Sequence, residues 1–200
     1  MEFLVQARAM GLETHVMLTL TRANIDQVIP LGYELRGLTG RFSFNRLAQV
    51  GEAADLEAVG RDEFQAFLNQ YAAARVANPV LGFKDNLFNI LRHHRKQRLT
   101  GGCTGFGCGA AFNFVALLPD GEVHACRKFP SKIGNVREAH LATIYHSTEA
   151  QRYRSGSLAC RKCQLRQKCG GCLAVTYGRG FDPLRERDPE CFMPISTSSL

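Results

Sequence analysis

Apolar and polar positions follow each other in a pattern that predicts helices and strands in turn over the first half of the chain. Apolar residues recur at helical spacing over Phe3–Met10, and the β-rich run Thr14–Thr21 predicts a strand. A helix with Asn24 as its N-cap is expected next. The alternating phenylalanines of Arg41–Leu47 then predict a second strand.

Two longer helices complete this half in the prediction, over Arg61–Val76 and Lys84–Arg98. Strand–helix–strand–helix order implies parallel strands joined by helical crossovers, so the predicted fold class is α/β. Two or three strands cannot close a barrel. We therefore expect an open edge and an apolar sheet face that must be covered. Either a partner supplies the cover or the chain is a piece of a longer protein.

The second half is predicted to begin with a β-hairpin. The apolar run Ala111–Leu118 and the segment Glu122–Cys126 read as its strands, and Pro119–Gly121 has the residues of a tight turn. A further turn is expected at Ile133–Asn135, and a helix over Leu141–Arg154. The rest of the chain is predicted to be loop-rich.

All eight cysteines lie in this second half. The densest run is CRKCQLRQKCGGC, residues 160–172, with the spacing C-x2-C-x5-C-x2-C. The start of the chain lacks the basic segment and long apolar core of a secretion signal, so we expect a reducing, cytoplasmic location that disfavours disulfides. Clustered thiols in such a compartment are more often metal ligands, and the loops that carry them are expected to need metal to fold.

Eight thiolates divide into two four-ligand sites, which either tetrahedral zinc or iron–sulfur clusters would suit. A zinc ribbon would place its C-x2-C pairs about 15–20 residues apart. Here the pairs at residues 160–163 and 169–172 are separated by five residues. Glycines crowd the thiols, which lets backbone amides approach sulfur. The spacing favours iron–sulfur clusters and leaves zinc open.

Four stretches of the second half carry a family resemblance. PDGEVHAC, IGNV, CRKCQLRQKCGGC and DPEC resemble the SPASM domain, the C-terminal twin-cluster extension of radical SAM peptide-modifying enzymes. The resemblance covers about residues 101–192, and all eight cysteine positions are filled in order. One departure is x2 in place of x3 between Cys169 and Cys172, which puts the geometry of the Cys172 contact in doubt.

The resemblance implies two auxiliary [4Fe-4S] clusters. It assigns to the first cluster Cys103, Cys108, Cys126 and Cys172, and to the second Cys160, Cys163, Cys169 and Cys191. Three cysteines of the run at residues 160–172 would then bind the second cluster, and its last cysteine, Cys172, would bind the first cluster.

Residues 1–98 are similar to the C-terminal strands and helices of an incomplete radical SAM barrel, and residues 99–200 would form the SPASM domain. Cleavage of S-adenosylmethionine in this family needs a C-x3-C-x2-C run, and these 200 residues contain none. S-adenosylmethionine is therefore expected as a cofactor only if a missing N-terminal radical SAM half completes the site. The sequence of residues 108–135 is also similar to that of maturases of the selenobiotic or thio(seleno)oxazole type, which act on selenocysteine- or cysteine-containing ribosomal peptides.

Charge and hydropathy narrow the classes of partner. The net charge is +7, with basic runs at Arg92–Arg98 and Arg161–Lys168. Aromatic residues are not interleaved with these runs and tryptophan is absent, which argues against a nucleic-acid interface. The bases could instead form a solvated face or balance the charge of anionic clusters. No apolar run reaches the ~18 residues of a membrane span, so no membrane partner is expected.

Three functions remain on the sequence alone. The first is the auxiliary-cluster portion of a radical SAM enzyme that modifies a ribosomally made precursor peptide or protein, not catalytically complete by itself. The second is a peptide- or protein-binding module without catalysis, stabilised by zinc or by clusters. The third is a small electron-transfer protein. The sequence does not identify the catalytic residues, the peptide or the bond formed. Arg46, on the second predicted strand, is left without an assigned role.

Overall fold

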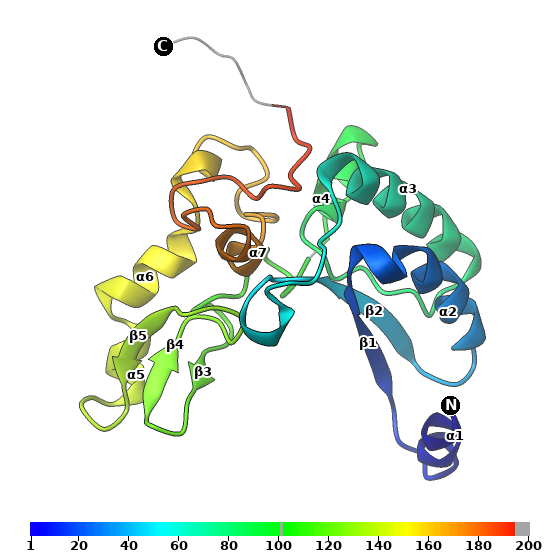
Figure 1. Cartoon of the computed structure of the whole chain (residues 1–200), viewed down its shortest axis with the longest axis horizontal. Helices are drawn as coiled ribbons and strands as arrows, with labels where there is room; N and C mark the ends of the chain where they lie inside the picture. The colour runs from blue at the N-terminus through cyan, green and yellow to red at the C-terminus, as the bar shows by residue number, and fades with distance from the viewer. Residues whose placement is uncertain (101, 195–200) are drawn as a thin grey trace.

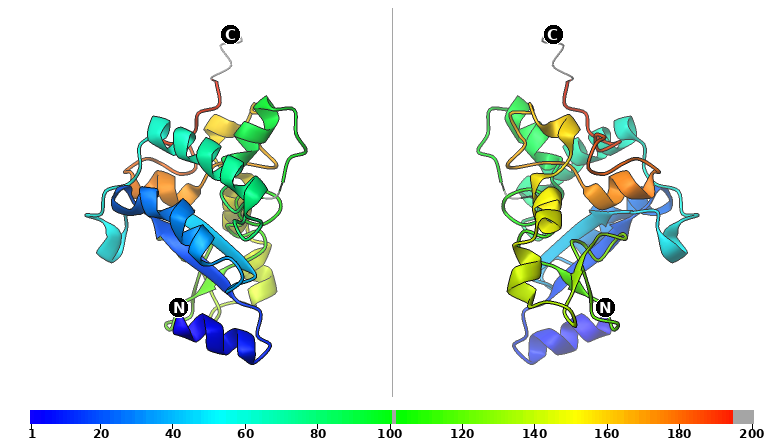
Figure 2. Two further views of the ribbon diagram at one scale, coloured as in Figure 1. Left: turned by 90° about the vertical axis from the view of Figure 1, so that its right-hand side faces the viewer. Right: turned by 90° about the vertical axis from the view of Figure 1, so that its left-hand side faces the viewer.

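A computed structural model describes residues 1–100 and 102–194 of the chain. Two lobes stand side by side in Figure 1, one formed by the first half of the sequence and the other by the second. The side views of Figure 2 show α1 (Glu2–Ala9) at the end of the molecule opposite α3 (Arg61–Ala77). Within the described residues, no helix has the length and apolarity needed to cross a membrane.

The first lobe is built on two parallel strands, β1 (His15–Leu20) and β2 (Arg41–Arg46), as predicted. Their register pairs His15 with Arg41 at one end and Leu20 with Arg46 at the other. The connection between them is helical, which is how parallel neighbours are usually joined. It runs through η1 (Arg22–Gln27) and α2 (Val28–Glu34), and the lobe is completed by η2 (Gly51–Ala53), α3 and α4 (Phe88–His94).

An aromatic cluster forms the core between the strands and the helices that follow them. Phe44 is fully buried and meets the rings of Phe64, Phe67, Tyr71 and Phe88 at centroid distances of 5.1–6.3 Å. Most of these contacts are edge-on or tilted, the arrangement that aromatic quadrupoles favour. The helical stripe expected for α3 is therefore confirmed, and it faces β2.

The other face of the sheet is polar, and the expectation of an uncovered apolar face is wrong. Strand alternation sends Phe42 and Phe44 to the core and turns His15, Met17 and Ser43 the opposite way. His15 Nε2 lies 2.8 Å from Ser43 Oγ on this face. The apolar face of the strands is covered by helices of the same lobe.

The expected cap at Asn24 is also wrong, because the helical segment begins earlier. Thr21 is the N-cap of η1, and Asn24 Oδ1 accepts a hydrogen bond from the Thr21 amide at 2.9 Å to close a capping box. Pro30 then falls in the first turn of α2, where a missing amide hydrogen costs little. The helix predicted over Lys84–Arg98 is shorter than expected, since α4 spans Phe88–His94 only.

The second lobe combines a small antiparallel sheet with short helices. β3 (Ala116–Leu117) and β4 (Glu122–His124) form the predicted hairpin, but β3 is much shorter than expected because Ala111 has a φ of +52° and breaks the extended run. The turn expected at Ile133–Asn135 is instead part of a third strand, β5 (Lys132–Asn135).

Helices of this lobe are shorter and more numerous than predicted. The helix expected over Leu141–Arg154 is divided into α5 (Leu141–Tyr145) and α6 (Thr148–Ser155). Ser147 separates them because its hydroxyl accepts a hydrogen bond from the Ala150 amide and caps α6. Two further helical segments lie among the cysteine loops, η3 (Leu158–Cys160) and α7 (Leu173–Gly178).

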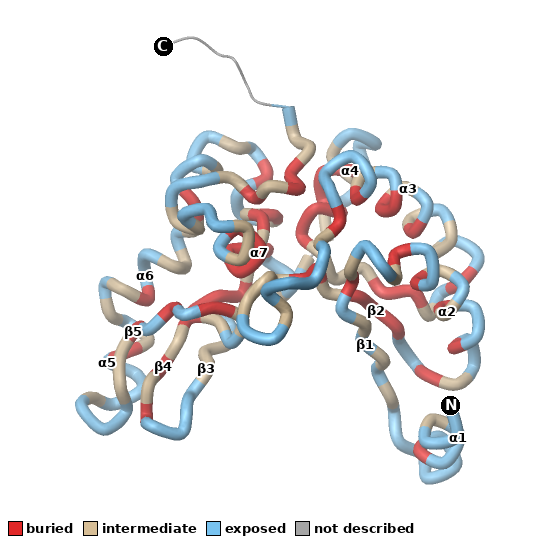
Figure 3. Tube along the Cα trace, in the orientation of Figure 1, coloured by how far each residue is buried: buried red, intermediate tan, exposed pale blue. Residues whose placement is uncertain are grey.

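The two lobes are packed together rather than loosely linked. Three buried residues of the second half, Leu165, Cys169 and Cys191, belong to the same hydrophobic cluster as the core of the first lobe. A separate cluster around Val123 and Ile144 fills the second lobe. Figure 3 shows buried segments on the sides of the lobes that face each other. The cysteine loops therefore lie at a buried seam.

Candidate metal centres

The eight cysteines are all within the described part of the chain, where none is paired in a disulfide. Their surroundings sort them into two groups. We call the first group site 1 and the second site 2. Site 1 consists of Cys103, Cys108, Cys126 and Cys172. Site 2 consists of Cys160, Cys163, Cys169 and Cys191.

Site 1 gathers three loops of the second lobe. Burial raises the pKa of the Cys108 thiol to about 12, and the nearby thiols of Cys172 and Cys103 add to this shift. Cys103 is also close enough to raise the pKa of Cys126, for which burial is the main cause. Each of these neighbours belongs to the set that the family resemblance assigns to the first cluster. Burial likewise raises the pKa of Cys172 to about 11.

Backbone amides point at the sulfurs of site 1. Ala110 and Leu173 donate to Cys108, and Val175, in the first turn of α7, donates to Cys172. Such donors favour the charged thiolate and tune the potential of a cluster bound to it. In the metal-free chain burial outweighs them, so a metal that binds here must displace protons from the thiols.

Site 2 surrounds a cavity of about 810 Å³, and all four of its cysteines line that cavity. Burial raises the pKa of Cys160, and the thiols of Cys191 and Cys163 add to this shift. Burial also raises the pKa of Cys169, whose sulfur accepts a hydrogen bond from the Gly171 amide. The Arg187 side chain contacts Cys191, with Nη2 of the arginine 3.0 Å from Sγ of the cysteine.

Basic residues from two distant runs meet around the site 2 cavity. His93 and His94, at the end of α4, line it together with Arg161, Lys162 and Arg166. The one carboxylate in the lining is that of Asp188, which is buried and ion-paired. The basic runs that the sequence singled out are thus gathered beside thiols, where their charge would balance an anionic group.

The thiols are not gathered as ligands of a single ion would be. Across residues 1–100 and 102–194, no three His, Cys, Asp or Glu side chains come together closely enough to hold one metal ion. The four thiols of site 2 are instead distributed around a cavity of about 810 Å³.

Two glycines let the chain pass from site 2 to site 1 within three residues. Gly170 and Gly171 have φ values of +64° and +65°, which side-chain-bearing residues rarely adopt. They reverse the chain between Cys169 and Cys172. The loops of the two sites also touch, because a Cβ on Gly107 would lie 2.8 Å from the Cys169 carbonyl oxygen.

Two buried asparagines of the first half hold these loops, and neither was expected to have a role. Asn86 Oδ1 accepts the Cys103 amide at 2.8 Å, and its Nδ2 donates to the Gly171 carbonyl. Asn89 bonds Thr100 and donates to the Lys168 carbonyl. Both asparagines interrupt the apolar run of residues 86–91, a signal that could have marked them as buried polar residues with fixed partners.

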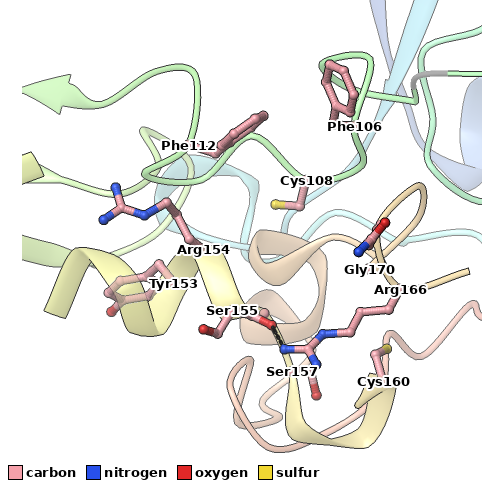
Figure 4. Close-up of a pocket in the computed structure, with 12 residues that line it drawn as sticks. Phe106, Cys108, Phe112, Tyr153, Arg154, Ser155, Ser157, Cys160, Arg166 and Gly170 are labelled. Atoms are coloured by element: carbon pink, nitrogen blue, oxygen red, sulfur yellow. Dashed lines mark hydrogen bonds between the residues drawn. The ribbon is translucent and has the colours of Figure 1, made fainter. Parts of the chain in front are cut away.

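A second hollow of about 310 Å³ lies between the two sites (Figure 4). Cys108 of site 1 and Cys160 of site 2 both line it, and Phe106 and Phe112 form one wall. Their rings meet edge to face at 6.1 Å although both are exposed. Arg166, bonded to the Ser155 carbonyl at 2.9 Å, lies on the opposite side. The hollow offers aromatic and guanidinium surfaces to a ligand.

Part of the second lobe matches a known domain family in sequence. Residues 108–172 match SPASM, an iron–sulfur cluster-binding domain. The antilisterial bacteriocin subtilosin biosynthesis protein AlbA of Bacillus subtilis (strain 168) is 25% identical over 172 residues, which is 81% of this chain and 36% of AlbA.

Two solved structures are similar to this chain in fold. The crystal structure of Streptococcus suis SuiB bound to S-adenosylmethionine superposes with a TM-score of 0.64 at 18% identity, covering 96% of this chain and 48% of SuiB. A second SuiB structure gives 0.61, also at 18% identity, covering 100% of this chain and 49% of SuiB. The chain thus spans about half of SuiB and about a third of AlbA. Residues 108–172 therefore match a SPASM iron–sulfur cluster-binding domain, and the chain as a whole is similar in sequence to part of AlbA and in fold to part of SuiB.

Proposed function

We propose that the chain is the auxiliary-cluster part of a radical SAM enzyme that modifies a ribosomally made peptide or protein, and that it binds two [4Fe-4S] clusters. The observation that carries this proposal is the sorting of the thiols into two groups of four. The proximity of thiols within each group, and the cavity that the four cysteines of site 2 share, support the two ligand sets that the family resemblance implies. Site 1 would hold one cluster and site 2 the other.

The residues present fit iron–sulfur clusters. Thiolate is the usual protein ligand of such clusters, and each site offers four. Backbone amides approach several of the sulfurs, and the glycines between them keep that approach open. Bound clusters would supply one-electron transfer. The chain's own contribution is to hold eight sulfurs, to exclude water from the more buried ones and to surround site 2 with positive charge.

The division of labour within the chain is part of the proposal. Residues 99–200 would form the cluster domain and residues 1–98 the last strands and helices of an incomplete barrel. The two hydrophobic clusters support this division, although Leu165, Cys169 and Cys191 cross it to join the first. Because these 200 residues contain no C-x3-C-x2-C run, S-adenosylmethionine would bind only with an N-terminal radical SAM half.

A peptide is the proposed substrate, and the hollow between the sites is where a side chain of it would dock. Phe106 is exposed and stands between two glycines with positive φ values, Gly105 at +93° and Gly107 at +85°. Phe112 follows Ala111, one of the two residues other than glycine with positive φ in the described chain. Unusual backbone of this kind is often found at binding sites. We place this function in the cytoplasm, where thiols remain reduced.

Anaerobic purification with iron, sulfide and zinc assays tests the proposal. About eight iron and eight sulfide per chain, with a visible band near ~400 nm, is the expected result for two [4Fe-4S] clusters. Cys172→Ala should remove about half of the iron, and Cys163→Ala the other half, because the two cysteines belong to different sites. Two zinc ions with no sulfide would replace the proposal with a zinc-stabilised binding module. Intact clusters without any peptide-dependent change would favour a simple electron-transfer protein.

A further inference from the structure

Arg46 is the one buried lysine or arginine among the described residues, and the proposed function gives it no role. It is the last residue of β2 and is 5% exposed. Its Nε lies 2.7 Å from Asp85 Oδ2, and its two terminal nitrogens lie 2.8 Å and 2.7 Å from the two oxygens of Asp188. The nitrogen Nη1 is also 2.8 Å from Glu190 Oε2. One guanidinium thus joins the first lobe to the loop that carries Cys191.

Mutual attraction favours the charged forms of Arg46 and Asp188, whereas burial raises the pKa of Glu190. Burial opposes ionisation of Arg46, but Asp188 and Asp85 outweigh it and hold the pKa of Arg46 well above its usual value. Burial also opposes ionisation of Asp188, yet the attraction of Arg46 lowers the pKa of that carboxyl. Arg179 pairs with Glu190 at 3.1 Å and adds a second cation.

Asp188 connects this ion cluster to both metal sites. Its Oδ2 accepts a hydrogen bond from the Cys172 amide at 2.7 Å, and Cys172 belongs to site 1. Its backbone carbonyl accepts the Cys191 amide at 3.0 Å, and Cys191 belongs to site 2. Asp188 therefore contacts the backbone of one ligand from each site while both of its carboxylate oxygens are held by Arg46.

Arg46 also acts on site 1 through its charge. Its Nη2 and the Cys172 amide lie on the same oxygen of Asp188, Oδ2, each at 2.7 Å, which places the guanidinium one carboxylate away from this ligand. Attraction between opposite charges is strong where water is excluded. Reduction of a cluster adds one negative charge, which a buried cation nearby stabilises.

We propose that Arg46 is a positioning residue for both metal sites: through Asp188 it fixes the backbone at Cys172 and Cys191, and its charge raises the reduction potential of the cluster at site 1. This proposal rests on the two-cluster function proposed above. It makes the first lobe part of the electronic environment of the clusters, because the cation comes from β2 and the cysteines from the second half.

Redox titration of the anaerobically purified chain, followed by electron paramagnetic resonance, tests this proposal. The variants are Arg46→Gln, Arg46→Lys and Asp85→Asn. The two signals are assigned with the Cys172→Ala and Cys163→Ala variants. Arg46→Gln should shift the potential of site 1 to more negative values and alter the spectra of both sites. Arg46→Lys keeps the charge and loses the forked geometry, so it should restore the potential of site 1 toward the wild-type value.

Asp85→Asn is the matched control for a merely structural role. The Asp85 carboxylate accepts hydrogen bonds from the Arg46 side chain and the Leu87 amide, whereas the Cys172 amide bonds Asp188. The Asp85→Asn substitution breaks a buried ion pair with Arg46 but removes a negative charge. It should therefore not make the reduction potential of site 1 or site 2 more negative. Equal negative shifts in Asp85→Asn and Arg46→Gln, or unchanged potentials and spectra in Arg46→Gln, would overturn the proposal.

Asp188→Asn is a second variant that tests the same coupling if Arg46→Gln does not accumulate. Asp188→Asn keeps an oxygen that can accept the Cys172 amide but weakens the hold of Arg46, and it should alter the spectra of both sites. A change confined to one site, or no change, would contradict the coupling. The wild-type chain separates the two proposals: without two clusters the proposed function fails, whereas two clusters that are indifferent to Arg46 and Asp188 overturn only this inference.

Discussion

Gly170 and Gly171 form a natural pair for testing how the turn between the two sites is built. Their φ values are +64° and +65°, so an alanine at either position meets the same backbone strain. Their surroundings differ. A Cβ on Gly170 would meet only the Arg166 carbonyl oxygen, at 3.5 Å, whereas a Cβ on Gly171 would lie 2.7 Å from Asp188 Cβ and 3.0 Å from its Oδ2. Comparing the two alanine variants isolates the contact with Asp188.

The expected magnitudes follow from these distances. The left-handed conformation costs an alanine about 1–2 kcal/mol, and this is the whole effect expected for Gly170→Ala. Gly171→Ala should lose the same amount and a further ~1–3 kcal/mol for overpacking, because Asp188 is held on its far side by Arg46 and cannot retreat freely. For a chain of this size each kcal/mol lowers the melting temperature by about 2–4 °C.

Thermal unfolding of the anaerobic, cluster-loaded chain is the assay, with iron content measured on the same samples. Gly170→Ala should melt about 2–8 °C below wild type, and Gly171→Ala should melt clearly lower again. Gly171→Ala should also lose iron from site 1, since Asp188 positions the Cys172 amide. Melting temperatures of the two variants that agree within ~2 °C would refute the reasoning, because only strain would then matter.

Four further predictions concern the core, the thiols and the hollow between the sites. Phe44→Ala should destabilise the chain by about 3–5 kcal/mol in the same thermal assay, because it empties the centre of the aromatic cluster, whereas Phe3→Ala, at a position 73% exposed, should change stability by less than ~0.5 kcal/mol. In the metal-free chain, mass spectrometry should find exposed Cys103 alkylated by iodoacetamide before buried Cys169; equal rates would contradict the burial pattern. The same chain should lose stability as the pH rises from near 9.0, the ordinary thiol pKa, toward the value of about 12 for Cys108, because unfolding releases a proton that the folded state retains; a metal-free chain that became more stable over this range would contradict the raised pKa. Phe106→Ala should weaken binding of the peptide Ac-Gly-Trp-Gly-amide several-fold, measured by quenching of the indole, since the chain itself has no tryptophan; Phe181→Ala, at another exposed phenylalanine, is the control and should not.

Local patterns in the sequence were enough to identify most elements of the first lobe. The stripe of α3 and the alternation of β2 are repeated over several turns or residues, so their periodicity indicates both the element and its buried face. The fold class and the SPASM resemblance were both confirmed. The resemblance is visible in the sequence because cysteine spacing is a local property that a cluster-binding loop must keep. The division into two thiol groups came from the resemblance and stays a prediction about metal.

The sequence did not predict the bounds of the short elements correctly, because contacts made elsewhere in the fold determine where these elements begin and end. The run expected to form a long strand is broken at Ala111, which is buried and whose amide donates to the Ala125 carbonyl at 2.9 Å. The helix expected from Leu141 is interrupted where Ser147 caps α6. Neither interruption changes the apolar pattern, so periodicity could not reveal it.

The sequence by itself determined the order and spacing of the eight cysteines, and on that spacing the prediction that they bind metal rests. Only the tertiary structure decided what holds them. Asn86 reaches Gly171 across 85 positions, and Arg46 reaches Asp188 across 142. Such contacts leave no periodic trace, and they form because a buried polar group must find its partner wherever the folded chain brings one within reach.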